Sequence, residues 1–424
     1  MARFVYTLLF YLAQPLIWVR LLWRARKQPE YLHHLSERYG FYSQPVPELL
    51  IWLHAVSVGE TRAAEPLIKA LLDAYPDHTL LMTHMTPTGR ATGAELIAKC
   101  GPRLTQAYLP YDLPDACARF LDHFKPRLGM LMETELWPNL IAVANRRRIP
   151  MALVNARLSE RSQRGYRRFA PLIRPALAAL HAVAAQTPAD AQRLMSIGAQ
   201  KVRVFGNLKF DVKPAPEKLA LGEQWRRKLG SRRVWLAAST REGEEAMILD
   251  AFARIGRPEV LLLLVPRHPQ RFAEVEALVE QRHLSCVKRS AGILPTPATR
   301  VWLGDSMGEM PAYFRVADLA LIGGTLLPFG GQNLIEAAAC GCPVLVGPHS
   351  FNFAQATDDA IACGAALRIA NADTAAGEVR RLFDEEDVLM GMRNAAADFS
   401  QAHRGATEKT VALIKEITAL QTAG

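Results

Sequence analysis

The sequence lacks both glycine-rich signatures that most often hold phosphate groups behind a β-strand. No G-x-G-x-x-G follows the first strand-like run of either half, and no G-x-x-x-x-G-K-[ST] occurs in the 424 residues. The first absence argues against a dinucleotide-dependent oxidoreductase, and the second argues against a P-loop NTPase.

Cysteine is scarce, and no metal-ligand spacing is present. None of the six cysteines forms a C-x-x-C pair, and the pair Cys340 and Cys342 has no second half. The 11 histidines are scattered, without an H-E-x-x-H pair. We therefore expect reduced thiols, no metal and no bound cofactor.

Long hydrophobic runs are missing except for one, residues 4–23, which is followed by Arg24, Arg26 and Lys27. A signal peptide would begin with its positive charges and end in a small-residue cleavage site. We predict that residues 1–27 form a membrane anchor, either a span or an interfacial helix. The basic cluster then places the body on the cytoplasmic side. The alternative is a helix that docks on another chain or domain.

The formal net charge of +10 favours an anionic partner, namely membrane lipid, a phosphorylated substrate or nucleic acid. RNA-binding domains place stacking aromatic residues among basic strands. The sequence shows no such arrangement, and we expect no nucleic-acid partner.

Beyond the first 27 residues, short apolar runs alternate with helical patterns, which is typical of parallel sheets covered on both faces. We predict an α/β chain with one doubly wound domain over residues 28–209, a linker over 210–221 and a second such domain over 222–424. The prediction leaves open that the last helix packs back on the first domain. A cleft is expected between the facing strand ends of the two domains. The predicted strands are 49–54, 79–83, 128–132, 151–155, 182–185, 202–205, 234–238, 260–265, 300–303, 319–322 and 344–346.

The end of the first predicted strand carries a candidate catalytic carboxylate. Ser57, Val58 and Gly59 form a small turn, and Glu60 opens the next helix. Ligands of open α/β sheets lie outside the carboxyl ends of the strands, and a helix N-terminus stabilises an ionised Glu. Glu60 is therefore a candidate general base, with Ser57 and Gly59 beside the substrate. The alternative is an ordinary first-turn Glu in an S-x-x-E cap.

A second candidate site lies in the other half, where a glycine-rich turn links a predicted strand to a helix. Glycines let backbone approach an anion, and the helix start offers N–H donors. Glu336 suits ribose hydroxyls, and it shares a helix face with the residue three positions earlier. The nucleotide-binding candidates of this half are Ser239, Thr240, Arg241, Arg267, His268, Gly323, Gly324, Thr325, Gly330, Gly331, Asn333 and Glu336.

Two doubly wound domains, one with a nucleotide-like site, indicate by analogy the GT-B class of glycosyltransferases. The chain resembles a family within that class, the 3-deoxy-D-manno-oct-2-ulosonic acid (Kdo) transferases of lipid A assembly. The matching stretches are 54–60 (HAVSVGE), 132–139 (METELWPN), 155–159 (NARLS), 206–211 (GNLKFD), 238–241 (ASTR), 266–269 (PRHP) and 323–336 (GGTLLPFGGQNLIE).

The resemblance implies a GT-B fold with an N-terminal membrane anchor. It implies CMP-Kdo as the donor and a tetraacyl lipid A precursor as the acceptor, at the cytoplasmic face of a bacterial inner membrane. Glu60 corresponds to the family's catalytic base, and the motifs of the second domain correspond to its CMP site.

The residues fit that chemistry. CMP leaves with a single phosphate, so arginines and N–H groups are expected to stabilise it without a metal. The carboxylate of Kdo needs further cations, for which Arg157 and Lys209 are candidates beside Asn207. Glu133 and Glu135 flank a predicted strand end, so we expect them to point to opposite sides, one lining the cleft and the other fixing its arginines.

Two other functions remain open at this point. One is a GT-B enzyme that uses a nucleoside diphosphate sugar and a different acceptor. The other is a non-enzymatic basic membrane module, against which the organised turns at Glu60 and at Gly323 argue.

Overall fold

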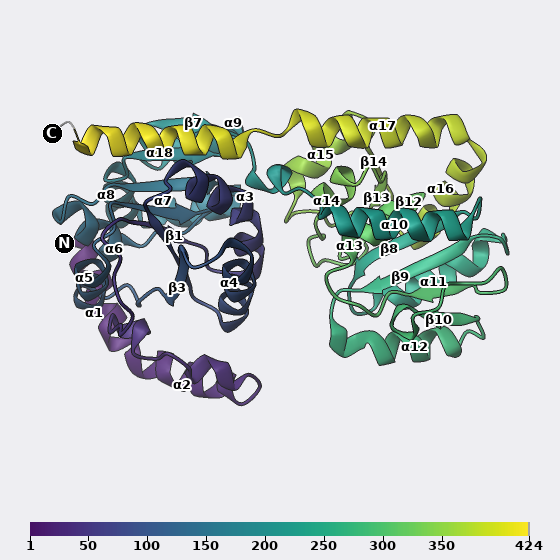
Figure 1. The fold of residues 1–424 in the computed structure, drawn as a ribbon, viewed down its shortest axis with the longest axis horizontal. Coiled ribbons are helices and arrows are strands. Elements are labelled where there is room, and N and C mark those ends of the chain that lie inside the picture. The colour runs from purple at the N-terminus through teal and green to yellow at the C-terminus, as the bar shows by residue number, and fades with distance from the viewer. Residues whose placement is uncertain (423–424) are drawn as a thin grey trace. The chain divides into compact units, whose positions relative to one another are not determined.

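The computed structural model describes residues 1–422 and divides into two compact units (Figure 1). The first unit contains Met1–Val212 and the C-terminal stretch that begins at Arg404, and the second contains Lys213–His403. Each unit is built on its own seven-stranded sheet. The predicted α/β class with two parallel sheets is confirmed.

The sheet of the first unit has the order β3-β2-β1-β4-β5-β6-β7, and all its neighbouring strands are parallel. The strand order reverses between β1 and β4, which makes their carboxyl ends the switch point where ligands bind in such sheets. The strands are β1 (Leu50–His54), β2 (Thr79–His84), β3 (Leu104–Tyr108), β4 (Leu128–Met132), β5 (Met151–Ala156), β6 (Ala182–Ala185) and β7 (Val202–Val204).

Helices cover both faces of this sheet, so β1 is buried along its whole length. Leu50 and Trp52 belong to one apolar cluster and Ile51 and Leu53 to the other, as the alternation of a strand requires. The helices of this unit's body are α3 (Val58–Ala74), α4 (Pro87–Cys100), α5 (Pro114–Phe124), α6 (Pro138–Arg146), α7 (Glu160–Arg168), α8 (Ala170–Ala178), α9 (Pro188–Ser196) and α18 (Ala406–Thr422).

The last helix, α18, returns to the first unit, as the sequence analysis allowed. It packs beside α3 (Figure 1), and the hydroxyls of Tyr75 and Thr418 lie 2.9 Å apart. Ile414 is fully buried in the apolar cluster that also holds Leu53. The second half of the chain therefore supplies part of the core under the first sheet.

The sheet of the second unit has the order β10-β11-β9-β8-β12-β13-β14, again all parallel. Its switch point lies between β8 and β12. The strands are β8 (Val234–Thr240), β9 (Leu261–Pro266), β10 (Cys286–Lys288), β11 (Val301–Leu303), β12 (Leu319–Ile322), β13 (Val344–Val346) and β14 (Ala366–Arg368).

Aromatic packing fixes helices to one face of the second sheet. Trp225 lies edge-on to Trp302 and stacks on Tyr313, with ring centroids 5.0 and 5.5 Å apart. A mainly aliphatic cluster, which also contains Trp235, Phe252 and Phe383, covers the other face. The helices of this unit are α10 (Pro216–Leu229), α11 (Glu244–Ile255), α12 (Phe272–Glu280), α13 (Met310–Val316), α14 (Leu334–Ala339), α15 (Ala354–Ala362), α16 (Ala372–Asp384) and α17 (Glu386–Ala402).

The predicted linker over 210–221 differs from the structure. The boundary between the units falls after Val212, and α10 already begins at Pro216. A proline in the first turn of a helix lacks only an N–H that has no partner there, so Pro216 starts a helix instead of interrupting one. The burial of Trp225 then anchors that helix.

Three strands were not predicted, namely β3, β10 and β14. All three lie at a sheet edge. Their side chains include half-buried ones, such as Thr105 and Gln106 in β3. An edge strand needs no continuous apolar run, because one side of it has no neighbouring strand and its faces are only partly covered.

The N-terminal apolar run forms two helices, α1 (Ala2–Leu12) and α2 (Gln14–Ala25), bent by 48° at the break before Pro15. Within residues 1–422 no single helix has both the length and the apolar character to cross a membrane, whereas this bent pair has both when taken together. The single anchor helix expected from the sequence is therefore not confirmed. Tyr6 donates a hydrogen bond to Asp112 at 3.0 Å, which ties α1 to the body of the first unit.

Candidate active site

The carboxyl end of β1 leads into a tightly bonded turn that holds Glu60. Ser57 caps α3, and its Oγ accepts a hydrogen bond from the Glu60 N–H at 3.4 Å. The carboxylate of Glu60 accepts from the Val56 N–H at 2.8 Å and from the Ser57 hydroxyl at 3.2 Å. The S-x-x-E cap is thus present, and it fixes the position of the carboxylate.

The pKa of Glu60 departs far from that of an ordinary glutamate. Burial raises it to about 7, and the charges of Glu133 and, to a lesser extent, Glu135 raise it further, against the lowering effect of the Val56 N–H and the Ser57 hydroxyl. We expected the helix N-terminus to keep this group fully ionised, but burial and like charge outweigh that effect. A carboxylate with a pKa near 7 is a stronger base than an ordinary glutamate and is still available at neutral pH.

Gly59 leaves room next to this carboxylate. A Cβ added at Gly59 would have Ser57 Oγ, 3.9 Å away, as its nearest neighbour. No packing within the unit therefore requires glycine here. An open surface beside Glu60 is consistent with the predicted contact of Gly59 with a substrate.

Glu133 binds both cations that we predicted for the substrate's carboxylate. Arg157 Nε lies 3.0 Å from it and Lys209 Nζ lies 3.2 Å from it. Glu133 is buried and has φ of 54°, a left-handed conformation that is uncommon outside glycine. This geometry agrees with a carboxylate that fixes the positions of neighbouring cations.

Strand alternation, from which we expected Glu133 and Glu135 to point to opposite sides, does not apply to these two residues. Both residues come after β4, which ends at Met132, so the alternation does not extend to them. Both charges raise the pKa of Glu60. Glu135 itself accepts a hydrogen bond from Trp137 Nε1 at 2.9 Å, and burial raises its own pKa.

Two asparagines position the segment that carries Lys209. Asn207 Oδ1 accepts from the Lys209 N–H at 3.0 Å, and Asn155 Oδ1 accepts from the Leu208 N–H at 3.0 Å. Asn155 is buried at the end of β5 with φ of 51°. The sequence analysis did not single out Asn155 as a site residue, although an asparagine in a matched motif could have indicated a left-handed position.

The switch point of the second sheet brings two backbone segments into direct contact. A Cβ added at Gly323, directly after β12, would lie 2.4 Å from the carbonyl oxygen of Ser239, the second-last residue of β8. Only glycine allows that approach. Gly324, Gly330 and Gly331 have φ of +71°, +89° and +82°, so the turn depends on glycine there as well.

A carboxylate that the sequence analysis missed holds this glycine-rich loop. The fully buried Glu244 accepts from the N–H groups of Arg241 at 2.9 Å, Gly324 at 2.6 Å and Leu326 at 2.9 Å. Burial raises the pKa of Glu244. The N–H of Gly331 bonds to the carbonyl of Gly324. Several N–H groups that we predicted to bind an anion thus donate hydrogen bonds to acceptors within the protein. Anion contact by these glycines stays a prediction.

Positive charge gathers beside the loop instead. The Arg241 guanidinium lies over the Phe329 ring, 4.6 Å from its centroid. Burial lowers the pKa of His268, and the nearby charges of Arg241, Arg267 and Arg271 lower it further. These cations therefore lie close enough together to disfavour a charged His268. A cluster of cationic side chains of this kind can bind a phosphate.

The remaining predicted residues of this site have structural partners. The Thr325 hydroxyl donates to the Ile322 carbonyl and accepts from the Gly347 N–H at 3.0 Å. Asn333 Oδ1 accepts from Ile335 N at 3.2 Å and so caps α14. Glu336 is half-buried in the first turn of that helix, and its ribose contact stays a prediction.

Comparisons with known proteins identify the family of the chain. Residues 33–212 match the family described as 3-deoxy-D-manno-octulosonic-acid transferase (kdotransferase). The 3-deoxy-D-manno-octulosonic acid transferase of Bordetella pertussis is 46% identical over 98% of this chain and 99% of its own length. That of Haemophilus influenzae is 36% identical, covering 98% of each chain.

A solved structure shows the same architecture at low sequence identity. The glycosyltransferase of Rickettsia africae is 14% identical and superposes with a TM-score of 0.60, covering 89% of this chain and 99% of its own. At this identity the likeness concerns the fold alone. It supports the two-domain glycosyltransferase fold that the sequence predicted.

Proposed function

The chain belongs to the family of Kdo transferases, which are glycosyltransferases, and from that premise we propose that it transfers Kdo from CMP-Kdo to a lipid A precursor with inversion. The observation that carries the proposal is the half-buried Glu60 carboxylate, whose pKa is raised to about 7 and which lies at the switch point of the first sheet.

Glu60 acts in this proposal as the base. It takes the proton of the acceptor hydroxyl while that oxygen bonds to the anomeric carbon of Kdo. The bond from this carbon to the phosphate oxygen breaks, and its electron pair leaves with CMP. One displacement on the face opposite to the leaving group inverts the anomeric configuration.

The other charged groups receive roles that their contacts support. Arg241 and Arg267 compensate the phosphate of the departing CMP, because they belong to the cationic group around His268. Arg157 and Lys209 are held in place by Glu133 and orient the Kdo carboxylate. A donor with one phosphate and a sugar carboxylate thus matches two separate groups of cations.

Mass spectrometry of reaction products tests donor and acceptor together. The full-length protein is incubated with a phosphorylated tetraacyl disaccharide and either CMP-Kdo or a nucleoside diphosphate sugar. We expect a mass increase of one or more Kdo units with CMP-Kdo only. Transfer from a nucleoside diphosphate sugar in its place would favour the other GT-B function.

The pH dependence of kcat/KM tests the assignment of the base. Because the ionised Glu60 is the active form, we expect kcat/KM to fall as the pH drops below about 7. Glu133→Gln removes a negative charge and so should lower that midpoint by about one pH unit. Glu135→Gln should lower it less, since Glu135 contributes less to the raised pKa. Equal midpoints in wild type and both variants would contradict the electrostatic argument.

We propose that transfer needs no divalent metal. In the part of the chain that the structure describes, no group of three or more His, Cys, Asp or Glu side chains is placed to hold a metal ion. The cationic group around His268 supplies the positive charge that a leaving phosphate requires. Transfer rates with and without excess EDTA should agree. Loss of activity that one added divalent ion restores would refute this.

We propose that the N-terminal helices seat the protein on the cytoplasmic face of a bacterial inner membrane. Leu12, Leu16 and Val19 are each more than 60% exposed on α1 and α2, next to a basic chain segment. Replacing all three with Ser keeps the bond from Tyr6 to Asp112 and should abolish flotation with anionic vesicles at moderate salt, while transfer to acceptor in detergent persists.

The matched control replaces exposed apolar side chains elsewhere. Val388 and Met390 are exposed on α17, and Ser at both positions should leave flotation at the wild-type level. Equal flotation of the triple variant and this control would place the main membrane contact outside α1 and α2.

A further inference from the structure

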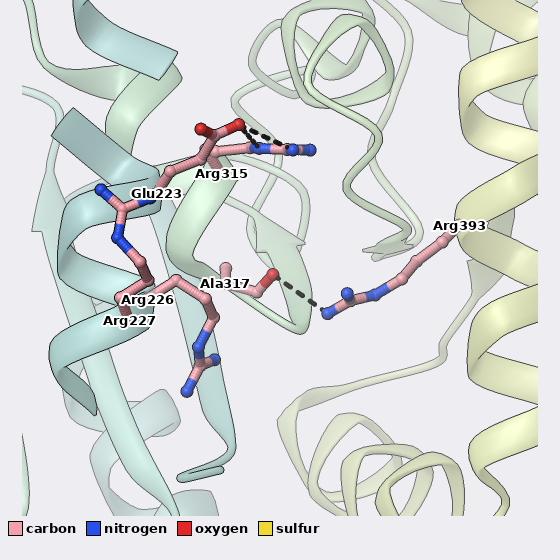
Figure 2. A pocket seen from close by; sticks show the side chains of 6 residues that line it. All are labelled: Glu223, Arg226, Arg227, Arg315, Ala317 and Arg393. Carbon is pink, nitrogen blue, oxygen red and sulfur yellow. Dashed lines mark hydrogen bonds and ion pairs between the residues drawn. The ribbon is translucent and has the colours of Figure 1, made fainter. Parts of the chain in front are cut away.

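A cationic pocket lies in the second unit, away from the glycine-rich loop. Its volume is about 300 Å³, and it is formed by α10, α13 and α17 (Figure 2). Ala317 belongs to its wall and comes two residues before β12, whereas Gly323 directly follows that strand. The pocket and the candidate nucleotide site are therefore at opposite ends of the same sheet. The residues that line the pocket are Glu223, Arg226, Arg227, Arg315, Ala317 and Arg393.

A buried carboxylate fixes two of the four arginines. Asp318 accepts from Arg226 Nη1 at 3.0 Å and from Arg393 Nη2 at 2.7 Å, and it also accepts from the N–H of Val234 at 2.7 Å. Only 5% of Asp318 is exposed. The guanidinium groups of Arg226 and Arg393 are therefore ordered before any ligand arrives, which lowers the entropy cost of binding.

The other two arginines are accessible. Arg227 is exposed, and Arg315 pairs with Glu223 at 2.9 Å, both side chains being nearly half exposed (Figure 2). The four arginines of the pocket face two carboxylates, Glu223 and Asp318, which leaves an excess of two positive charges. An ion pair this exposed contributes little to stability, so Arg315 can exchange Glu223 for a stronger anion at small cost.

We propose that this pocket is a second anion site, which binds a ligand bearing one or two phosphate groups. Guanidinium forks match phosphate oxygens in shape and charge, and the excess charge corresponds to that of a phosphate. The ligand is either a soluble phosphate compound or the headgroup of an anionic lipid. The site is distinct from the proposed CMP site, because the strand β12 separates the two.

Calorimetric titration with inorganic pyrophosphate tests the soluble source, using the full-length protein at constant ionic strength. The variant Arg227→Gln/Arg315→Gln leaves the bonds to Asp318 in place. The control Lys228→Gln/Arg380→Gln removes the same charge from exposed positions on α10 and α16 that do not line the pocket. We expect pyrophosphate affinity at least about tenfold lower in the variant than in the control, because two charge-assisted contacts are lost.

Flotation with phosphatidylglycerol vesicles tests the lipid source on the same two proteins. Reduced flotation of the variant relative to the control identifies a lipid headgroup, and a reduced pyrophosphate affinity with equal flotation identifies a soluble phosphate. Pyrophosphate bound at the other end of the sheet would be equal in both proteins. If the variant and the control agree in both assays, with equal melting temperatures, the proposal is overturned.

Discussion

Replacing Glu60 with glutamine should slow Kdo transfer by about 10²- to 10⁴-fold, the usual contribution of a general base. Glutamine has the shape of glutamate, and its carbonyl oxygen can still accept the hydrogen bond from the Val56 N–H. It cannot take a proton from the acceptor hydroxyl. Single-turnover rates with CMP-Kdo measure the loss, and titration with CMP should show unchanged affinity.

A glutamate on the same helix provides the control. Glu65 lies in α3 and pairs with Lys69 at 2.7 Å, near the surface. Glu65→Gln should therefore retain wild-type transfer. If Glu60→Gln keeps more than about a tenth of wild-type turnover, another group is the base.

The same substitution should change stability in a pH-dependent way. Because the folded-state pKa of Glu60 is raised to about 7, the folded protein holds a proton that the unfolded chain releases near its ordinary, lower pKa. Wild-type stability therefore falls as the pH rises through this window, and the loss persists above it. Glu60→Gln has no such loss, so it should melt above wild type at about pH 8, with the difference closing toward about pH 5.

The central strands could be predicted from the sequence because burial on both faces requires continuous apolar runs. Leu261–Pro266 is buried at every position, and its short, unbroken apolar run favours a buried strand. The edge strand Leu104–Tyr108 includes half-buried Thr105 and Gln106, and its pattern resembles that of a loop. The bend before Pro15 was also not predicted. The apolar composition shows how long the run is, but it does not show whether the run forms one continuous helix.

The candidate site was predictable where a single residue follows a strand and was not where long-range partners matter. Glu60 can be located by its place after β1 alone. Its pKa cannot, because that value depends on burial and on Glu133, 73 positions away in the sequence. Likewise, the role of Glu244 arises from the N–H groups of Gly324 and Leu326, which lie on a distant loop. No local pattern reports such contacts.

The carboxylate of Glu244 yields the second large expected effect, on donor binding. Its two oxygens accept from three backbone N–H groups, those of Arg241, Gly324 and Leu326. In Glu244→Gln an amide NH2 group replaces one carboxylate oxygen, and this group donates hydrogen bonds but cannot accept them. At least one buried N–H then loses its partner and faces another donor, at a cost of about 1–3 kcal/mol. The glycine-rich loop should relax away from this arrangement.

We expect this relaxation to weaken CMP binding by about 5- to 150-fold, because restoring the bound geometry of the loop then costs about 1–3 kcal/mol. The loss should raise KM for the donor more than it lowers kcat, since the nucleotide is held equally in the ground and transition states. The midpoint of the pH profile, which belongs to Glu60 in the first unit, should stay where it is.

Glu242→Gln, an exposed neighbour on the same segment, is the matched control and should bind CMP as wild type does. Unchanged CMP affinity in a folded Glu244→Gln protein would show that the loop does not contact the nucleotide, and a moved pH midpoint would show that the substitution acts on the base instead.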